Sequence, residues 1–209
     1  MPDTGEPGLE PLRSDVDEDG LASAPGSADN IDVVPSTSVS PRAPLRAWRD
    51  TDIEAVLGIN AASQPHVARL DRAEVRRLLV IGARIWVVTG DGDEVIAYLI
   101  AFPSDAPYDG QEFAYFTGRL GGGFLYVEQV AIHPHHRRAG LGRALYEHVA
   151  GMARAERLRA LCCEVNLVPP NPDSRVFHAR AGFVAVDQLK LPDGRTVELL
   201  TRGLAEPVA

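Results

Sequence analysis

The most constraining feature of the sequence is an apolar strand that runs, through a short arginine- and glycine-rich turn, straight into a helix. Residues Phe124–Ile132 (FLYVEQVAI) are apolar on both faces, as the central strand of a sheet should be. The turn ends in Gly140-Leu141-Gly142, and from residue 140 to about residue 156 apolar side chains recur with helical spacing. Strands and helices joined this tightly occur where helices pack on a sheet, so the sequence predicts an α/β fold.

The rest of the domain continues this alternation. Periodicity and turn residues predict strands at 45–48, 84–89, 95–102, 124–132, 161–165, 184–191 and 196–201, and helices at 51–62, 71–81, 140–156 and 172–181. Residues 103–123 are interpreted as a long connecting loop, and loops of this length often carry function. The order of elements predicts a mixed sheet with at least one strand–helix–strand crossover.

Charge is unevenly distributed along the chain. Residues 1–42 hold nine acidic residues and two arginines, so this segment carries −7 of the net charge of −8. It is rich in Asp, Glu, Ser, Pro and Gly and has no aromatic residue, which predicts a disordered tail ahead of a folded domain at 43–209. The domain itself is nearly neutral, so it offers no electrostatic surface for nucleic acid.

Compartment and metal content follow from what the sequence does not contain. The longest apolar runs are too short to span a membrane, and the acidic start is unlike a secretory signal, so we expect a cytoplasmic protein. Cys162 and Cys163 are adjacent on an expected strand and point to opposite faces, which disfavours a disulfide between them. No Cys/His spacing indicates zinc, and His133, His135 and His136 are interpreted as a solvated turn, so no metal is expected.

The turn at 137–142 has the chemistry of a pyrophosphate site. Glycine lets the backbone approach a phosphate without a clashing Cβ, and the free N–H groups and dipole of a helix start favour negative charge. R-x-x-G-x-G alone is weak evidence, because such turns also serve close packing. The dinucleotide fingerprint fails since Leu145 stands where its third glycine would be, and a Walker loop fails since the only lysine is Lys190.

Three segments, in this order and spacing, resemble the acyl-CoA-binding core of the GNAT N-acetyltransferase superfamily: VAIHPHHRRAGLGRAL at 130–145, LCCEVN at 161–166 and PNPDSRVFHARAGF at 170–183. The chain is most similar to a subgroup of bacterial acetyltransferases with an EVN…PPNP…FHA..GF signature. The resemblance implies a mixed, mostly antiparallel twisted sheet of six to seven strands flanked by about four helices. It also implies that this sheet is splayed between its central strands.

The resemblance further implies how the co-substrate acetyl-CoA would bind. The backbone amides of Val130 and Ile132 would pair with the pantetheine arm, as a peptide adds to a sheet edge. Asn171 and Ser174, at the start of a later helix, would contact the CoA arm. The residues of the turn would hold the pyrophosphate: Arg137, Arg138, Ala139, Gly140, Leu141 and Gly142.

Two residues are candidates for catalysis. Glu128 is the one acid in an otherwise uncharged strand, so burial should raise its pKa above about 4.3 and suit it as a general base; the alternative is a structural carboxylate paired with an arginine. His178 stands where many GNAT enzymes have a tyrosine that protonates the departing thiolate. An imidazole can donate a proton near neutral pH, or it serves only for packing or for binding CoA. Tyr108 and Tyr115 are reserve candidates.

The sequence leaves two functions open. The first is an acetyl-CoA-dependent N-acetyltransferase, in which a primary amine attacks directly within a ternary complex. The second is a domain that binds acyl-CoA without catalysis, as a sensor or interaction module. The resemblance places the acceptor near residues 51–82 and 103–123 without identifying it, and it is compatible with a homodimer.

Overall fold

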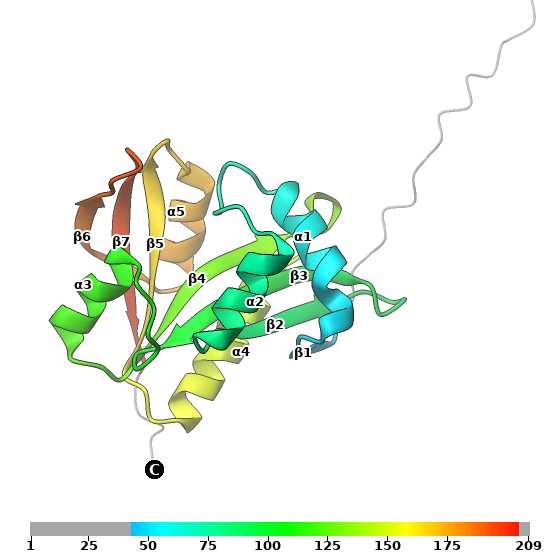
Figure 1. Ribbon diagram of the computed structural model, residues 1–209, viewed down its shortest axis with the longest axis horizontal. Helices are drawn as coiled ribbons and strands as arrows, with labels where there is room; N and C mark the ends of the chain where they lie inside the picture. Colours follow the sequence, from blue (N-terminus) through cyan, green and yellow to red (C-terminus); the bar gives the residue numbers. More distant parts are fainter. Residues whose placement is uncertain (1–42, 205–209) are drawn as a thin grey trace, which may run out of the picture. The chain divides into compact units, whose positions relative to one another are not determined.

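The computed structural model describes residues 43–204, so the acidic tail expected at 1–42 lies outside the described residues (Figure 1). The strands are β1 (Leu45–Ala47), β2 (Arg84–Thr89), β3 (Val95–Pro103), β4 (Phe124–Ile132), β5 (Ala160–Val168), β6 (Val184–Lys190) and β7 (Thr196–Gly203). The α-helices are α1 (Ile53–Ala61), α2 (Arg72–Val80), α3 (Gln111–Leu120), α4 (Leu141–Ala155) and α5 (Pro172–Arg180). No helix within 43–204 is long and apolar enough to cross a membrane.

All seven strands belong to one sheet, in the order β1-β2-β3-β4-β5-β7-β6. Every neighbouring pair is antiparallel except β4 and β5, which are parallel and are connected through α4. Parallel neighbours need such a crossover, whereas antiparallel strands can be joined by a turn. The predicted mixed, mostly antiparallel sheet with a strand–helix–strand unit is therefore confirmed.

The sheet is splayed between β4 and β5, as the resemblance implied. These strands pair only at their first residues, from Phe124 with Ala160 to Tyr126 with Cys162. Beyond Tyr126 the two strands diverge, while β4 stays paired with β3 and β5 stays paired with β7 (Figure 1). The divergence leaves backbone groups of β4 without a strand partner on the β5 side.

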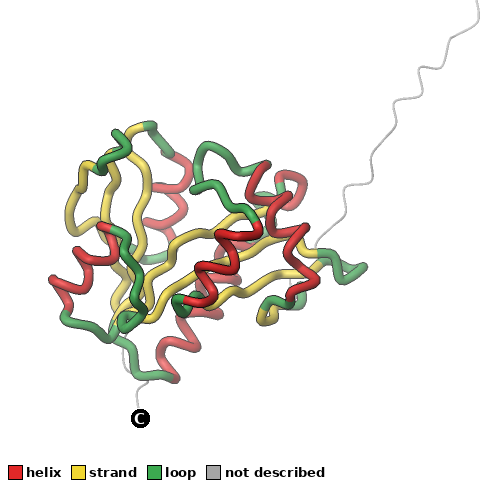
Figure 2. The backbone as a smooth tube through the Cα atoms, in the orientation of Figure 1, coloured by secondary structure: helices red, strands yellow, loops and turns green. Residues whose placement is uncertain are grey.

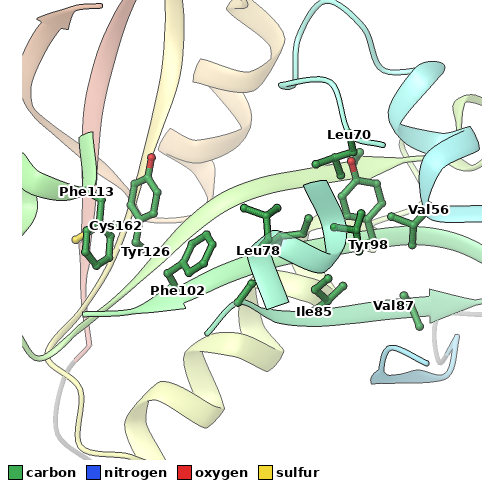
Figure 3. Packing of buried hydrophobic residues seen from close by; sticks show 14 of the residues in the cluster. Val56, Leu70, Leu78, Ile85, Val87, Tyr98, Phe102, Phe113, Tyr126 and Cys162 are labelled. Atoms are coloured by element: carbon green, nitrogen blue, oxygen red, sulfur yellow. The ribbon is translucent and has the colours of Figure 1, made fainter. Parts of the chain in front are cut away.

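Helices cover both faces of the sheet (Figure 2). One side, called the α1 face, is covered by α1, α2 and α3, and the other, called the α4 face, by α4 and α5. Alternation along β3 supplies both cores: Tyr98 and Phe102 point to the α1 face (Figure 3), and Leu99 points to the α4 face. Facing residues of α4, such as Leu145 and Val149, are fully buried.

The segment interpreted as a long loop at 103–123 contains the helix α3, and that part of the sequence-based interpretation is wrong. Phe113 and Phe116 are buried from this helix and pack against Phe124 of β4, so tertiary contacts stabilise a helix that its two flanking glycine-rich turns disguise in the sequence. Gly121 ends the helix in the left-handed conformation, at φ 65°. The domain thus has five α-helices where about four were expected.

A buried polar network attaches the α1–α2 connection to the sheet. Asn60, at 1% exposure, has Nδ2 within 2.9 to 3.2 Å of three acceptors that share its two N–H groups: the carbonyl oxygen of Ala68, Tyr98 Oη and Gln129 Oε1. Its Oδ1 accepts from the amide of Leu70 at 2.9 Å. Because these buried polar groups all have hydrogen-bond partners, they hold the connection in one position; it is drawn as a loop in Figure 2.

Candidate active site

The open side of β4 offers backbone donors where the two central strands diverge. The amide of His133 donates to the carbonyl oxygen of Ile96 in β3, at 2.8 Å. Because N–H directions alternate along a strand, the amides of Val130 and Ile132 point the other way, toward the side that β5 has left. A pantetheine arm lying between the strands could therefore accept hydrogen bonds from these two amides, as the resemblance implied.

The turn after β4 has the backbone of an anion site. Arg138 and Gly140 both have positive φ, at 65° and 80°, and Gly140 is the N-cap of the fifteen-residue helix α4. The first intrahelical bond runs from the amide of Ala144 to the carbonyl oxygen of Gly140, so the amides of residues 141–143 point out of the helix start without helical partners. Three arginines in this turn and in the first turn of α4 add positive charge to the segment: Arg137, Arg138 and Arg143.

Gly142 is required for a different reason from Gly140. A Cβ at Gly142 would lie 3.1 Å from the ring of Phe177 in α5 and 3.4 Å from Ile132 Cδ1, whereas a Cβ at Gly140 would meet nothing. Gly142 therefore allows the close approach of α4, β4 and α5, and Gly140 supplies the left-handed turn. The free amides, the positive charge and this absence of side-chain bulk fit a CoA pyrophosphate.

A β-bulge positions Glu128. Its neighbours Val127 and Gln129 pair with Ala101 and Ile100 of β3, so Glu128 is an extra residue with no partner in β3. As a result the side chains of Glu128 and Gln129, adjacent in the chain, both lie on the α1 face. Bulges next to active sites commonly re-aim a side chain in this way.

The carboxyl of Glu128 is held between opposing influences. Removal from water raises its pKa to about 7, with a further contribution from the negative charge of Glu112. The Tyr108 hydroxyl opposes this shift by donating a 2.7 Å hydrogen bond to Oε2 of Glu128. No arginine is paired with Glu128 in the described domain, so the alternative of a salt-bridged structural carboxylate lacks its partner.

A second carboxyl, missed in the sequence analysis, stands on the other side of the splay. Glu164 of β5 accepts a 2.6 Å hydrogen bond at Oε2 from the hydroxyl of Tyr126. Burial raises its pKa well above the usual range, and the charges of Glu128 and Glu112 raise it further. The available signal was the one acid in the apolar strand LCCEVN, the same pattern that singled out Glu128.

His178 lies in α5 with both ring nitrogens in hydrogen bonds. It is 3% exposed, Nδ1 lies 2.8 Å from the carbonyl oxygen of Ser174, and Nε2 lies 2.8 Å from the hydroxyl of Tyr146. Burial lowers its pKa below the ordinary value, which favours the neutral ring. A neutral ring that donates from Nδ1 to the carbonyl accepts the Tyr146 proton at Nε2.

Asn171 caps the start of α5. Asn171 accepts a hydrogen bond at Oδ1 from the amide of Ser174, at 3.2 Å. The hydroxyl of Ser174 lies 3.2 Å from Nδ1 of His178. Asn171 and Ser174 thus build the helix start that the sequence assigned to the CoA arm.

The three clustered histidines lie at the end of β4 and in the following single turn, Pro134–His136. The rings of His133 and His135 are 5.2 Å apart, and burial, with smaller contributions from the neighbouring histidines and Arg137, lowers the pKa of His133. Among residues 43–204, no group of three or more His, Cys, Asp or Glu side chains is arranged to hold a metal ion.

Comparison with known proteins agrees with this arrangement. The family model described as the acetyltransferase (GNAT) family matches residues 54–183, which is more than half of the chain. The chain therefore belongs to the GNAT acetyltransferase family. A search among curated proteins finds no match.

Solved structures share the fold. A ribosomal-protein-alanine N-acetyltransferase from Brucella melitensis is 20% identical, with a TM-score of 0.59 over 77% of this chain and 99% of that one. A GNAT phosphinothricin acetyltransferase from Sinorhizobium meliloti, solved with acetyl-CoA, is 20% identical, with a TM-score of 0.60 over 79% and 93%. At such low identity these likenesses show the fold alone.

Proposed function

We propose that the protein transfers the acetyl group of acetyl-CoA to a primary amine by direct attack in a ternary complex, with Glu128 as general base. The observation that carries this proposal is a carboxyl whose pKa is raised to about 7, aimed by a bulge into the splay of a GNAT fold. A base is most effective when its pKa lies near the working pH.

The co-substrate would be held by backbone more than by side chains. The amides of Val130 and Ile132 would receive the pantetheine arm, and the turn at 137–142 the pyrophosphate. Asn171 and Ser174 would contact the arm from the start of α5. Bound in this way, acetyl-CoA supplies an activated thioester carbonyl, which the amide of Val130 would polarise.

The chemistry then needs one proton removed and one returned. Glu128, about half ionised at neutral pH, takes the proton of the attacking amine as the new N–C bond forms and the C–S bond breaks. The thiolate leaves as the C–S bond breaks and takes up a proton from water, and the proton held by Glu128 returns to solvent once the products dissociate. A reaction that consumes acetyl-CoA is expected in the cytoplasm, which is the compartment we propose.

We propose that His178, the sequence candidate for the acid, acts as a positioning residue. Its Nδ1 proton is directed to Ser174 and its Nε2 accepts from Tyr146, so the neutral ring has no proton to offer a thiolate. The bond to Tyr146 attaches α5 to α4, and the bond to Ser174 lies within α5 and orients the ring; α5 carries Asn171 and Ser174, which would contact the CoA arm. The KM-against-kcat measurement that tests this role is given in the Discussion.

The test of the proposed function compares wild type with Glu128→Gln. Calorimetric titration with acetyl-CoA measures binding, and release of free CoA with a broad panel of amines measures turnover. We expect both proteins to bind acetyl-CoA equally and turnover to fall by about 10²-fold or more in the variant, the typical contribution of a general base.

The same pair of measurements separates the second function. An acyl-CoA-binding module without catalysis would bind acetyl-CoA in both proteins and release CoA in neither. Loss of acetyl-CoA binding in Gly140→Asp, which introduces a negative side chain at the helix start, checks that binding occurs at the turn. A well-folded wild type that binds no acetyl-CoA contradicts both functions.

A further inference from the structure

Two glutamates lie opposite each other where β4 and β5 diverge. The last residues that pair in parallel are Tyr126 and Cys162, and both side chains belong to the core on the α1 face. Glu128 and Glu164 each follow two residues later, and side chains two apart in a strand share a face. The hydroxyl of Tyr126 donates to Glu164 at 2.6 Å, from one strand to the other. The two carboxyls are therefore neighbours at the opening of the splay.

Each carboxyl has one oxygen fixed by a tyrosine and one oxygen free. Tyr108 donates to Oε2 of Glu128 at 2.7 Å, and Tyr126 donates to Oε2 of Glu164. The two tyrosine rings are 6.1 Å apart between centroids, so the two pairs stand side by side. Neither Oε1 has a hydrogen-bond partner within residues 43–204, and neither is closed off from solvent. One free oxygen from each strand thus remains available to a substrate between the strands.

The two carboxyls do not ionise together. Neighbouring carboxylates repel, so one of them keeps its proton to higher pH. Burial raises the pKa of Glu164 well above its usual range and the charge of Glu128 raises it further, whereas the pKa of Glu128 is raised to about 7. At neutral pH Glu164 is therefore protonated while Glu128 is partly ionised. Because Oε2 of Glu164 accepts from Tyr126, the proton of Glu164 is on Oε1, the free oxygen.

The other charged groups around the two carboxyls keep this order. Glu112 of α3 raises the pKa of both carboxyls, and Arg195 in the β6–β7 turn lowers the pKa of both. Glu74 of α2 adds to the pKa of the β4 carboxyl. On the α4 face, Tyr146 and Cys163 stay protonated because burial raises their pKa values. A protonated carboxyl and an ionised carboxyl thus face each other across the splay.

We propose that Glu164 is the general acid of the reaction, giving its Oε1 proton to the CoA thiolate while Oε1 of Glu128 takes the proton of the amine. This inference rests on the proposed function and replaces water as the source of the thiolate's proton. Two titratable groups whose environments separate their pKa values are suited to divide the acid and base roles.

The division of roles also balances the protons. As the N–C bond forms and the C–S bond breaks, Glu128 becomes neutral and Glu164 becomes ionised. A proton then passes from Glu128 to Glu164, directly or through water, and the starting state is restored. The two carboxyls gain and lose no net proton, as required when a neutral amine and a thioester give an amide and a thiol.

The experiment measures kcat against pH for the full chain and for Glu164→Gln, with saturating acetyl-CoA and the best amine of a broad panel. The variant keeps the shape of the side chain but has no acidic proton, so kcat should fall about 10²–10⁴-fold. The basic limb should disappear, the acidic limb set by Glu128 should stay, and calorimetric acetyl-CoA affinity should not change. Glu156→Gln, an exposed carboxylate paired with Arg84, is the control. An unchanged kcat, or loss of the acidic limb instead, overturns the proposal.

Tyr126→Phe tests the same assignment if Glu164→Gln folds poorly. The hydroxyl of Tyr126 stabilises the ionised form of Glu164, so its removal raises the pKa of that carboxyl. The acid works protonated, and the basic limb of kcat should therefore move about one pH unit higher while the acidic limb stays in place. A residue with a merely structural role would lower kcat without moving this limb, and that result contradicts the acid.

Failure of the proposed function would be seen separately. If the protein acetylates no amine, infrared spectroscopy of the protonated carboxyl C=O stretch observes the two glutamates directly. At about pH 8 wild type should show a protonated carboxyl that Glu164→Gln lacks. In Glu128→Gln this carboxyl should titrate at lower pH, because the facing charge is gone. A spectrum that neither variant changes rules out the proton on Glu164.

Discussion

The hydroxyl of Tyr108 donates a 2.7 Å hydrogen bond to Oε2 of Glu128, across twenty positions of sequence. Tyr108 lies in the segment that leads into α3, and Glu128 is the bulged residue of β4. The bond stabilises the ionised carboxyl against the burial that raises its pKa to about 7. It therefore sets the pH at which the proposed base becomes active.

Removal of this hydroxyl should shift the pH profile. A hydrogen bond to a charged group contributes about 1.5–3 kcal/mol, so Tyr108→Phe should raise the pKa of Glu128 by about one unit or more. Because the base works ionised, the acidic limb of kcat/KM moves to higher pH, and activity at pH 7 falls about fivefold. Tyr115→Phe, which removes a hydroxyl of α3 that is bonded to Asp187 and not to Glu128, is the control. An unmoved acidic limb in Tyr108→Phe would contradict this coupling.

Glu128 should cost the protein stability at high pH. Its pKa is raised in the folded state from an ordinary value of 4.5 to about 7, so between these values the folded state binds more protons than the unfolded state. Its contribution to the free energy of unfolding therefore declines as pH rises through this window. Glu128→Gln removes the titration and should be more stable than wild type at pH 8 by on the order of 1 kcal/mol, with little gain at pH 5. Urea unfolding at both pH values measures the difference, and an equal gain at both would refute the assignment.

Gly142→Ala should impair both packing and acetyl-CoA binding. The new Cβ would lie 3.1 Å from the ring of Phe177, so α4 and α5 must separate or the ring must move, at a cost of about 1–3 kcal/mol. We expect a lower melting temperature and weaker acetyl-CoA binding by calorimetry. The smaller side chain in Phe177→Leu should partly relieve the clash, so the double variant should lose less than the sum of the single losses. Strictly additive losses would mean that the clash is not with Phe177.

Asn60→Ala should loosen the connection between α1 and α2. It leaves the buried hydroxyl of Tyr98, the amide oxygen of Gln129 and the amide of Leu70 without one partner each. We expect a loss of about 2–4 kcal/mol in urea unfolding. Because the connection lies within residues 51–82, where we propose that the acceptor binds, KM for the amine should rise while calorimetric acetyl-CoA affinity stays unchanged. A matching loss of acetyl-CoA affinity would show that the network supports the whole domain instead.

His178→Gln distinguishes positioning from acid catalysis. If His178 fixes α5 against α4 through Tyr146, its loss raises KM for acetyl-CoA and changes kcat by less than about tenfold. If it protonates the thiolate, kcat falls by about 10²–10⁴-fold with KM nearly unchanged, and the basic limb of the pH profile disappears. Steady-state kinetics with acetyl-CoA as the varied substrate gives both parameters.

Much of the fold was readable because it rests on local patterns. The apolar runs of β2 to β5 and the R-x-x-G-x-G turn before α4 are properties of short segments, and the structure has strands and a turn there, as the sequence predicted. The helix α3 was missed because it is stabilised by Phe113 and Phe116 packing against β4, a contact that no local pattern reveals.

The site was only half readable for the same reason. Glu128 was evident as a lone acid in an apolar strand, but its partner Tyr108 comes from a segment without a motif. The bulge that aims Glu128 depends on the register with β3, which the sequence of β4 alone does not determine. The hydrogen bond that occupies Nε2 of His178 was also not predictable, because its partner Tyr146 lies 32 positions earlier, in the helix α4.

The extra residue in β4 places two side chains with different tasks next to each other on the same face of the sheet. The proposed base and Gln129, which donates to the carbonyl oxygen of Ala68 and so anchors the α1–α2 connection, share one peptide bond. A molecule that displaced the α1–α2 connection on entering the site would also shift the backbone next to Glu128. Binding on the proposed acceptor side and the direction of the Glu128 carboxyl would thus be linked through one planar amide.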